Sequence, residues 1–184
     1  MDQEQKKIQE SRDIIISAIA QTMVIYGVTP SVGRIYGVLY FSDDPMSLNE
    51  IKDAVAMSKG SVSTGLRELL ETEMIIKVWK KGDRKDHYIA EKDFVKNFIT
   101  FFVKNIRLER SITLNASSNV RPKLKELSEN ARSSEIRREA QRDLELLADT
   151  DSYFQWTKTI IDDMESGEFF KHYPLPNKKQ SGED

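Results

Sequence analysis

The chain has 184 residues, with 28 Lys or Arg against 30 Asp or Glu, which gives a formal net charge of −2. This length fits one domain, or one domain with an appended oligomerisation region, and an apolar fraction of 39% excludes a disordered chain. A charge so near neutrality gives no overall sign of nucleic-acid binding, so any such binding has to come from a local patch.

Several classes of site are excluded by residue type. The chain has no cysteine, which excludes a disulfide framework, a thiolate nucleophile and Cys-based metal centres. The two histidines, His87 and His172, have no nucleophile or ligand pattern nearby, and no phosphate-binding glycine loop occurs. We therefore expect no enzyme activity, no metal and no cofactor.

The first residues, MDQEQKKIQESRD, are polar and lack the apolar stretch of a signal peptide. The longest apolar runs are a few residues, far below the ~20 that cross a bilayer. These features predict a cytoplasmic protein with no membrane association.

Two amphipathic helices are predicted first. From Lys6 to Gly27 the apolar positions recur at helical spacing, and Gly27 ends the pattern. These positions are Ile8, Ile15, Ile19, Met23 and Tyr26. The second helix begins at Pro30 and ends before Asp43-Asp44-Pro45, because the residue before a proline is disfavoured in helical conformation. Within it, Gly33-x-x-x-Gly37 indicates close packing against a neighbour.

The next stretch predicts a helix-turn-helix. Ser47 and Glu50 have the spacing of a capping box, which starts a short helix. Ser58 can cap a second helix after a turn of about three residues. The expected inward positions are Leu48, Ile51 and Val55 of the first helix, then Val62, Leu66, Leu69 and Leu70 of the second.

The spacing of the apolar residues then changes from a period of 3.6 residues, typical of a helix, to a period of 2, typical of a strand. Residues 75–80 and 87–89 are rich in strand formers and flank a charged turn at 81–85, as in a β-hairpin. A helix-turn-helix followed by such a hairpin is a winged helix, which we place at 44–90, with the first two helices packed against it.

Helical spacing returns after Glu91. Phe94, Phe98, Phe101 and Phe102 predict a helix that continues to Leu108. We expect a second short helix from Pro122 to about Ala131, and a third, capped by Ser134, from 135 to about 164. The fold class is therefore mainly α with a small antiparallel β-hairpin.

The second helix of the helix-turn-helix presents small polar and basic residues on its outer face, as entry into the major groove requires. They are Lys59, Gly60, Ser61, Ser63, Thr64 and Arg67. Arg67 can make a bidentate pair with guanine. The alternative is an ordinary solvated helix face.

The hairpin supports the DNA-binding interpretation. Between Lys77 and Asp86 five basic residues minus two acidic residues give +3. Such a tip can follow phosphates or place an arginine in the minor groove, whereas the alternative is a merely soluble hairpin. Asp83 is expected to hold the turn or to orient Arg84. By contrast, residues 143–170 have eight acids and one lysine, a sum of −7, which DNA would repel.

Three local stretches, YGVTPSVGRIYGVLYF, SKGSVSTGLREL and KVWKKGDRKD, resemble the GbsR branch of the MarR superfamily. The likeness runs from about Ile14 to Phe102, roughly half the chain. Repressors of this branch control genes for osmoprotectant uptake and for converting choline to glycine betaine.

The resemblance implies a homodimer whose N- and C-terminal helices form the dimerisation region, with two winged helices on a palindromic double-stranded DNA operator. The implied domains are an N-terminal helix (1–29), a winged helix-turn-helix (30–90), a C-terminal dimerisation and effector region (91–170) and a tail (171–184). The implied DNA-binding residues are Ser58, Lys59, Ser61, Ser63, Thr64 and Arg67 of the recognition helix, and Lys81, Arg84 and Lys85 of the wing.

The resemblance also implies a quaternary ammonium effector such as choline, which aromatic faces would bind. The candidates are Tyr26, Tyr36, Tyr40, Trp79, Phe94 and Phe98. Core or dimer packing explains most of them better than effector binding does, above all the stripe from Phe94 to Phe102. A different class of function also stays open, in which the winged helix is a protein-interaction module of a larger assembly and senses no effector.

Overall fold

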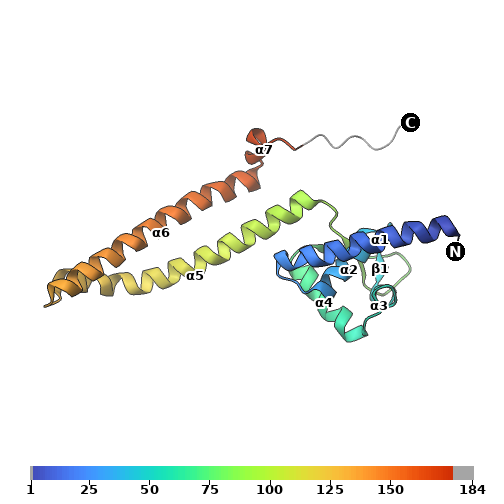
Figure 1. Cartoon of the computed structure of the whole chain (residues 1–184), viewed down its shortest axis with the longest axis horizontal. Helices are drawn as coiled ribbons and strands as arrows, with labels where there is room; N and C mark the ends of the chain where they lie inside the picture. The colour runs from blue at the N-terminus through green and yellow to red at the C-terminus, as the bar shows by residue number, and fades with distance from the viewer. Residues whose placement is uncertain (1, 176–184) are drawn as a thin grey trace. The chain divides into compact units, whose positions relative to one another are not determined.

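A computed structural model describes residues 2–175, and Figure 1 shows the order of the elements along the chain. The predicted tail therefore lies outside the described residues from residue 176 onward. The chain divides into two compact units, one up to Phe101 and one from Phe102. No helix in the described part of the chain is long and apolar enough to cross a membrane. The domain boundaries expected at 29/30 and 90/91 stay predictions.

The first unit contains two packed helices, a helix-turn-helix and a small sheet. In chain order its elements are α1 (Gln3–Thr22), the 3-10 turn η1 (Met23–Tyr26), α2 (Pro30–Tyr40), β1 (Met46–Ser47), α3 (Leu48–Val55), α4 (Lys59–Glu71), β2 (Ile75–Val78) and β3 (His87–Ala90). Helix α5 (Phe94–Asn130) begins in this unit, and α6 (Ser134–Ser166) and α7 (Phe169–His172) follow in the second. The predicted winged helix and the predominance of helix are confirmed.

The sheet has three antiparallel strands in the order β1-β3-β2. In the β2–β3 hairpin Ile75 pairs with Ala90 and Val78 pairs with His87. The sequence predicted only these two strands. The third, β1, is two residues long and pairs Ser47 with His87, and a segment so short shows no alternation from which a strand could be predicted.

Helix α2 is the centre of the core. Its Ile35, Tyr36 and Leu39 are at most 1% exposed, and they share one apolar cluster with residues of α3, α4 and the sheet. A Cβ on Gly33 would lie 2.8 Å from Ala20 Cα of α1, and one on Gly37 would lie 2.9 Å from Ile16 Cγ2. The close packing predicted for these glycines is confirmed.

The apolar face predicted for the first helix is confirmed at Ile19, Met23 and Tyr26, which lie in or against the core, and is wrong at its N-terminal end. The buried positions of α1 are Ile16 and Ala20, followed by Met23 in η1, whereas Ile8 and Ile15 of the expected apolar face are 55% and 48% exposed. The glycines of α2 explain the difference, because they admit Ile16 and Ala20 closely. The apolar stripe through Ile8 and Ile15 is left on the surface of the unit.

The C-terminal region is also corrected. The two helices expected before residue 131 are one helix, α5, with Pro122 in its interior, and Ser133 rather than Ser134 caps α6. A proline removes one backbone hydrogen bond, which tertiary packing can outweigh. The ion pair of Arg121 with Asp151 at 2.7 Å ties α5 to α6 beside Pro122. A second pair joins Arg107 to Glu165 at 2.6 Å, so the helices form an antiparallel hairpin (Figure 1).

Candidate nucleic-acid interface

The recognition helix α4 begins at a cap supplied by Ser58. The Ser58 hydroxyl accepts a hydrogen bond from Ser61 N at 3.1 Å and lies 2.8 Å from Ser61 Oγ. Val62, Leu66 and Leu69 are buried on the opposite face. All six predicted DNA-binding residues of this segment are exposed, namely Ser58, Lys59, Ser61, Ser63, Thr64 and Arg67.

The wing turns at Gly82, whose φ of +87° favours glycine. Asp83 Oδ1 accepts a hydrogen bond from Lys85 N at 3.0 Å, and Asp83 N donates to Lys80 O at 3.1 Å. The bond from Lys85 N is the main reason why the pKa of Asp83 is lowered. The turn-holding role predicted for Asp83 is therefore confirmed.

The wing keeps its positive charge although one of its ion pairs is internal. Lys77 Nζ lies 2.9 Å from Asp86 Oδ2, so these two charges cancel. The remaining cations are Lys80, Lys81, Arg84 and Lys85, and with Asp83 they sum to four minus one, or +3. None of the four forms an ion pair within the part of the chain that the structure describes.

A cavity of about 370 Å³ brings part of the predicted interface together. Its basic residues are Lys59 from the start of α4 and Arg84 and Lys85 from the wing. The remainder of the lining is Ser47, Leu48, Asn49, Asp86 and Tyr88. Three cations and the exposed first turn of α3 therefore surround a space in which a phosphate group is favoured.

Other predicted residues lie outside this cavity. Ser63, Thr64 and Arg67 are further along the exposed face of α4, and Lys81 is at the turn of the wing. Asn49 was missed by the sequence analysis. It reaches the wing because β1 pairs with β3 immediately before it, and a two-residue strand gave no signal for that placement.

The predicted effector residues separate into different surroundings. Tyr40 lies next to Tyr36 and Phe94, with ring centroids 6.1 Å and 5.4 Å apart. Tyr26 instead makes an edge contact with Phe101 at 4.8 Å. Trp79 lies on the wing with 77% of its surface exposed, and Phe98 is 47% exposed on α5. The structure thus gathers Tyr36, Tyr40 and Phe94, to which Phe41 adds an unpredicted ring 5.3 Å from Tyr40.

A polar network fixes Tyr36 in that cluster. Its hydroxyl donates to Glu91 O at 2.8 Å and accepts from Asn97 Nδ2 at 3.0 Å. The same amide group also donates to Glu91 O at 3.1 Å. Burial raises the pKa of Tyr36 to about 12. The phenol therefore connects the core helix α2 to the chain entering α5, and its hydroxyl is occupied.

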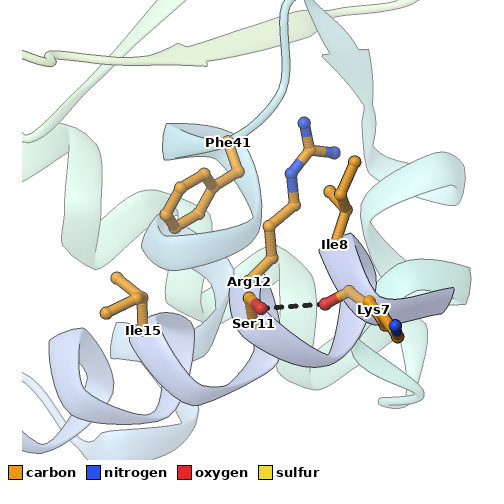
Figure 2. A pocket seen from close by; sticks show the side chains of 6 residues that line it. All are labelled: Lys7, Ile8, Ser11, Arg12, Ile15 and Phe41. Carbon is orange, nitrogen blue, oxygen red and sulfur yellow. Dashed lines mark hydrogen bonds between the residues drawn. The ribbon is translucent and has the colours of Figure 1, made fainter. Parts of the chain in front are cut away.

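Helix α1 carries an open groove of about 320 Å³, lined by Lys7, Ile8, Ser11, Arg12, Ile15 and Phe41. Figure 2 shows the Phe41 ring from the end of α2 facing the α1 side chains, with the Arg12 guanidinium beside Ile8. The Ser11 hydroxyl donates to Lys7 O at 2.8 Å and so lies against the helix itself. The surface between the two basic residues is therefore mainly apolar.

A capped recognition helix, a basic wing and a surrounding helical framework define a winged helix-turn-helix protein. Comparisons with known proteins agree. The chain is 35% identical over 172 residues to the HTH-type transcriptional repressor GbsR of Bacillus subtilis (strain 168), covering 93% of this chain and 95% of that protein. It is 30% identical over 168 residues to the HTH-type transcriptional repressor OpcR of the same organism, covering 91% of each.

Residues 94–171 match the model of the GbsR family transcriptional regulator, C-terminal helical hairpin. A crystal structure of a transcriptional regulator aligns with 88% of this chain and 99% of its own, with a TM-score of 0.61 and 18% identity, which supports the fold. The chain belongs to the GbsR family of transcriptional regulators, and its relatives are not enzymes. The resemblance found in the sequence is confirmed.

Proposed function

We propose that the protein is a transcriptional repressor that binds double-stranded DNA through α4 and the wing. The observation that carries this proposal is the convergence of Lys59, Arg84 and Lys85 on one cavity beside the exposed face of α4. This convergence supplies phosphate contacts next to a helix that can read base edges. The relatives named as repressors support the same assignment. Such a protein acts in the cytoplasm, where a bacterial chromosome lies.

The test is DNA binding as a function of salt, measured by fluorescence anisotropy. We expect log affinity to fall linearly with log salt concentration, because phosphate contacts release counterions. Arg67→Ala combined with Arg84→Ala should weaken specific binding by about 2 to 6 kcal/mol, if each arginine is worth about 1 to 3 kcal/mol. The matched control is Lys123→Ala with Lys125→Ala, which removes two exposed cations of α5. Equal operator affinity for both double variants would overturn the proposal.

We further propose that the repressor is a homodimer. In the second unit α6 buries Phe154, Thr157 and Ile161 but leaves a separate apolar stripe exposed. Leu146, Tyr153 and Trp156 form this stripe at helical spacing, with Trp156 62% exposed. Leu108 and Ile112 of α5 are exposed as well, and the α1 groove adds apolar surface in the first unit. Exposed apolar area of this extent is typical of an interface.

A twofold dimer predicts a palindromic operator with half-sites about one helical turn apart. Footprinting on genomic fragments tests this arrangement, because protection should appear in two symmetric halves. A single unpaired half-site would contradict it.

For the regulated genes we propose osmoprotectant uptake or synthesis, with a quaternary ammonium compound as effector. Tyr40 and Phe94, with ring centroids 5.4 Å apart beside the buried Tyr36, supply the kind of aromatic surface that binds such cations. Titration of choline and of glycine betaine into the protein, followed by calorimetry and by operator affinity, tests the proposal. No heat and no change in operator affinity at millimolar concentration would remove the effector while leaving the repressor intact.

The alternative is a winged-helix protein-interaction module. The same anisotropy experiment distinguishes it. A module of that kind shows no DNA affinity that falls steeply with salt, and Arg67→Ala would not reduce its DNA affinity.

A further inference from the structure

His87 lies at the base of the wing in the middle of the sheet. It is the first residue of β3, pairs with Ser47 of β1 on one side and with Val78 of β2 on the other, and is 2% exposed. A side chain that is polar and this deeply buried needs hydrogen-bond partners.

Both ring nitrogens of His87 face hydrogen-bond acceptors. Nδ1 lies 3.0 Å from Lys85 O, and Nε2 lies 3.6 Å from Asp83 Oδ2. The other oxygen of the same carboxylate, Asp83 Oδ1, accepts from Lys85 N. Two hydrogen-bonding contacts through the backbone of Lys85 and one longer contact of 3.6 Å between the imidazole and the carboxylate therefore connect Asp83, Lys85 and His87 around Arg84.

These contacts distinguish the two protonation states of the ring. A neutral imidazole carries one N–H, so whichever nitrogen lacks it presents a lone pair to an acceptor. An imidazolium donates from both nitrogens and faces the Asp83 carboxylate with an opposite charge. The Asp83 carboxylate thus favours the charged ring, against the cost of charging a ring that is 2% exposed.

We propose that His87 is the positioning residue of the wing: its protonated ring ties Asp83 to Lys85 and thereby holds Arg84 and Lys85 at the DNA-facing cavity. The inference rests on the proposed DNA-binding function and deepens it, because it makes operator affinity depend on pH. Lys85, whose carbonyl contacts the ring, lines the cavity, so we expect phosphates bound there and protonation of the ring to favour each other.

The charged groups around the ring come from the wing and from α3. Asp83 and, on α3, Glu50 interact electrostatically with His87. Ser47 lowers the pKa of Glu50 by hydrogen bonding, and Lys85 N lowers that of Asp83, so both remain ionised through the range in which histidine titrates. Lys80 acts electrostatically on both of these carboxylates and Lys85 acts on Asp83. The adjoining Asp86 is paired with Lys77, and the residues opposite His87 on β1 and β2 are uncharged.

The experiment measures operator affinity at fixed ionic strength between about pH 8 and pH 5.5, where histidine changes charge. The chain has two histidines, so variants can assign the effect. We expect wild-type affinity to rise on the order of tenfold as the pH falls. His87→Asn keeps a donor for Lys85 O but no titratable charge, and its profile should be nearly flat. The matched control His172→Asn should keep the wild-type profile.

A second variant tests the proposal without substituting His87, so it does not depend on whether the fold accepts another residue at that buried position. Asp83→Asn keeps an acceptor for Lys85 N and gives neutral Nε2 a donor, so the affinity at about pH 8 should rise severalfold and the pH dependence should shrink. Imidazole ¹⁵N spectra of the DNA complex provide a direct readout. Circular dichroism of each variant shows that it is folded under assay conditions.

The possible failures can be told apart. Absence of salt-dependent DNA binding by the wild type at every pH would overturn the proposed function. Wild-type binding with an unchanged pH profile in His87→Asn, or a neutral His87 ring in the complex at about pH 6, would overturn the role of His87 alone.

Discussion

Tyr36 has a phenol that folding keeps protonated. Its pKa is raised to about 12 from 10.0, chiefly by burial. Between these two pH values the folded state binds more protons than the unfolded state. The contribution of Tyr36 to the unfolding free energy is therefore fully present below about pH 10 and is lost as the pH rises towards 12. Wild-type unfolding free energy should fall on the order of 2 kcal/mol across this interval through Tyr36.

Tyr36→Phe should remove that contribution and also cost about 1 kcal/mol at neutral pH, because the Asn97 amide loses one of its two acceptors and Glu91 O loses one of its two donors. Urea unfolding at several pH values measures both effects. The control is Tyr173→Phe, at a 66% exposed position, which should retain the wild-type slope. Identical slopes for Tyr36→Phe and wild type would show that the phenol does not carry the effect.

Individual interface residues were predictable to different extents. The exposed positions of α4 followed from its helical period, and the role of Asp83 followed from the charged turn. Asn49 was not identified as part of the cavity lining and His87 was not expected to be buried, because the placement of both depends on strand pairing with β1. That pairing is a tertiary contact, and local spacing contains no information about it.

The packing of α1 on α2 depends on two glycines. An added Cβ at Gly33 would lie 2.8 Å and 2.9 Å from backbone atoms of Ala20, and backbone cannot move aside as a side chain can. Gly33→Ala should therefore lower the unfolding free energy by about 1 to 3 kcal/mol despite the higher helix propensity of alanine. Thermal or urea unfolding measures the loss.

Gly60→Ala is the matched control, since its Cβ would meet nothing closer than 4.0 Å. At that exposed helical position alanine should be neutral or stabilise by up to about 1 kcal/mol. Equal stability of the two variants would contradict close packing at Gly33.

Elements with a strong period and a clear cap were predicted from the sequence, and those governed by tertiary contacts were not. The Ser47 and Ser58 caps located α3 and α4. Pro122 suggested the start of a new helix, yet the helix is continuous there and the ion pair of Arg121 with Asp151 joins α5 to α6 beside it. For α1 the period was right and Met23, Ile19 and Tyr26 pack on the core as predicted, but Ile8 and Ile15 are exposed because small residues on α2 decided which side packs.

The net charge of −2 conceals an uneven distribution over the molecule. The +3 of the wing belongs to the first unit, and the −7 of residues 143–170 belongs to the second. Removing one phosphate contact reduces the salt slope of DNA binding by about one per protomer. Lys81→Ala should therefore lower the slope by about two in a dimer and weaken all DNA sequences alike. A loss confined to one base pair would show that Lys81 reads sequence instead.

Dimerisation and DNA affinity should fail together when the exposed stripe of α6 is charged. Trp156 is 62% exposed and lies beside Tyr153, with ring centroids 6.5 Å apart, so burying a glutamate there without a partner is costly. Trp156→Glu should shift the protein from dimer to monomer in sedimentation and weaken binding to the full operator by at least about tenfold, while leaving half-site binding unchanged. Gln155→Glu introduces the same charge at the adjacent exposed position and should remain dimeric. A dimeric Trp156→Glu protein with wild-type affinity would place the dimer contact on another surface, of which the α1 groove is the next candidate.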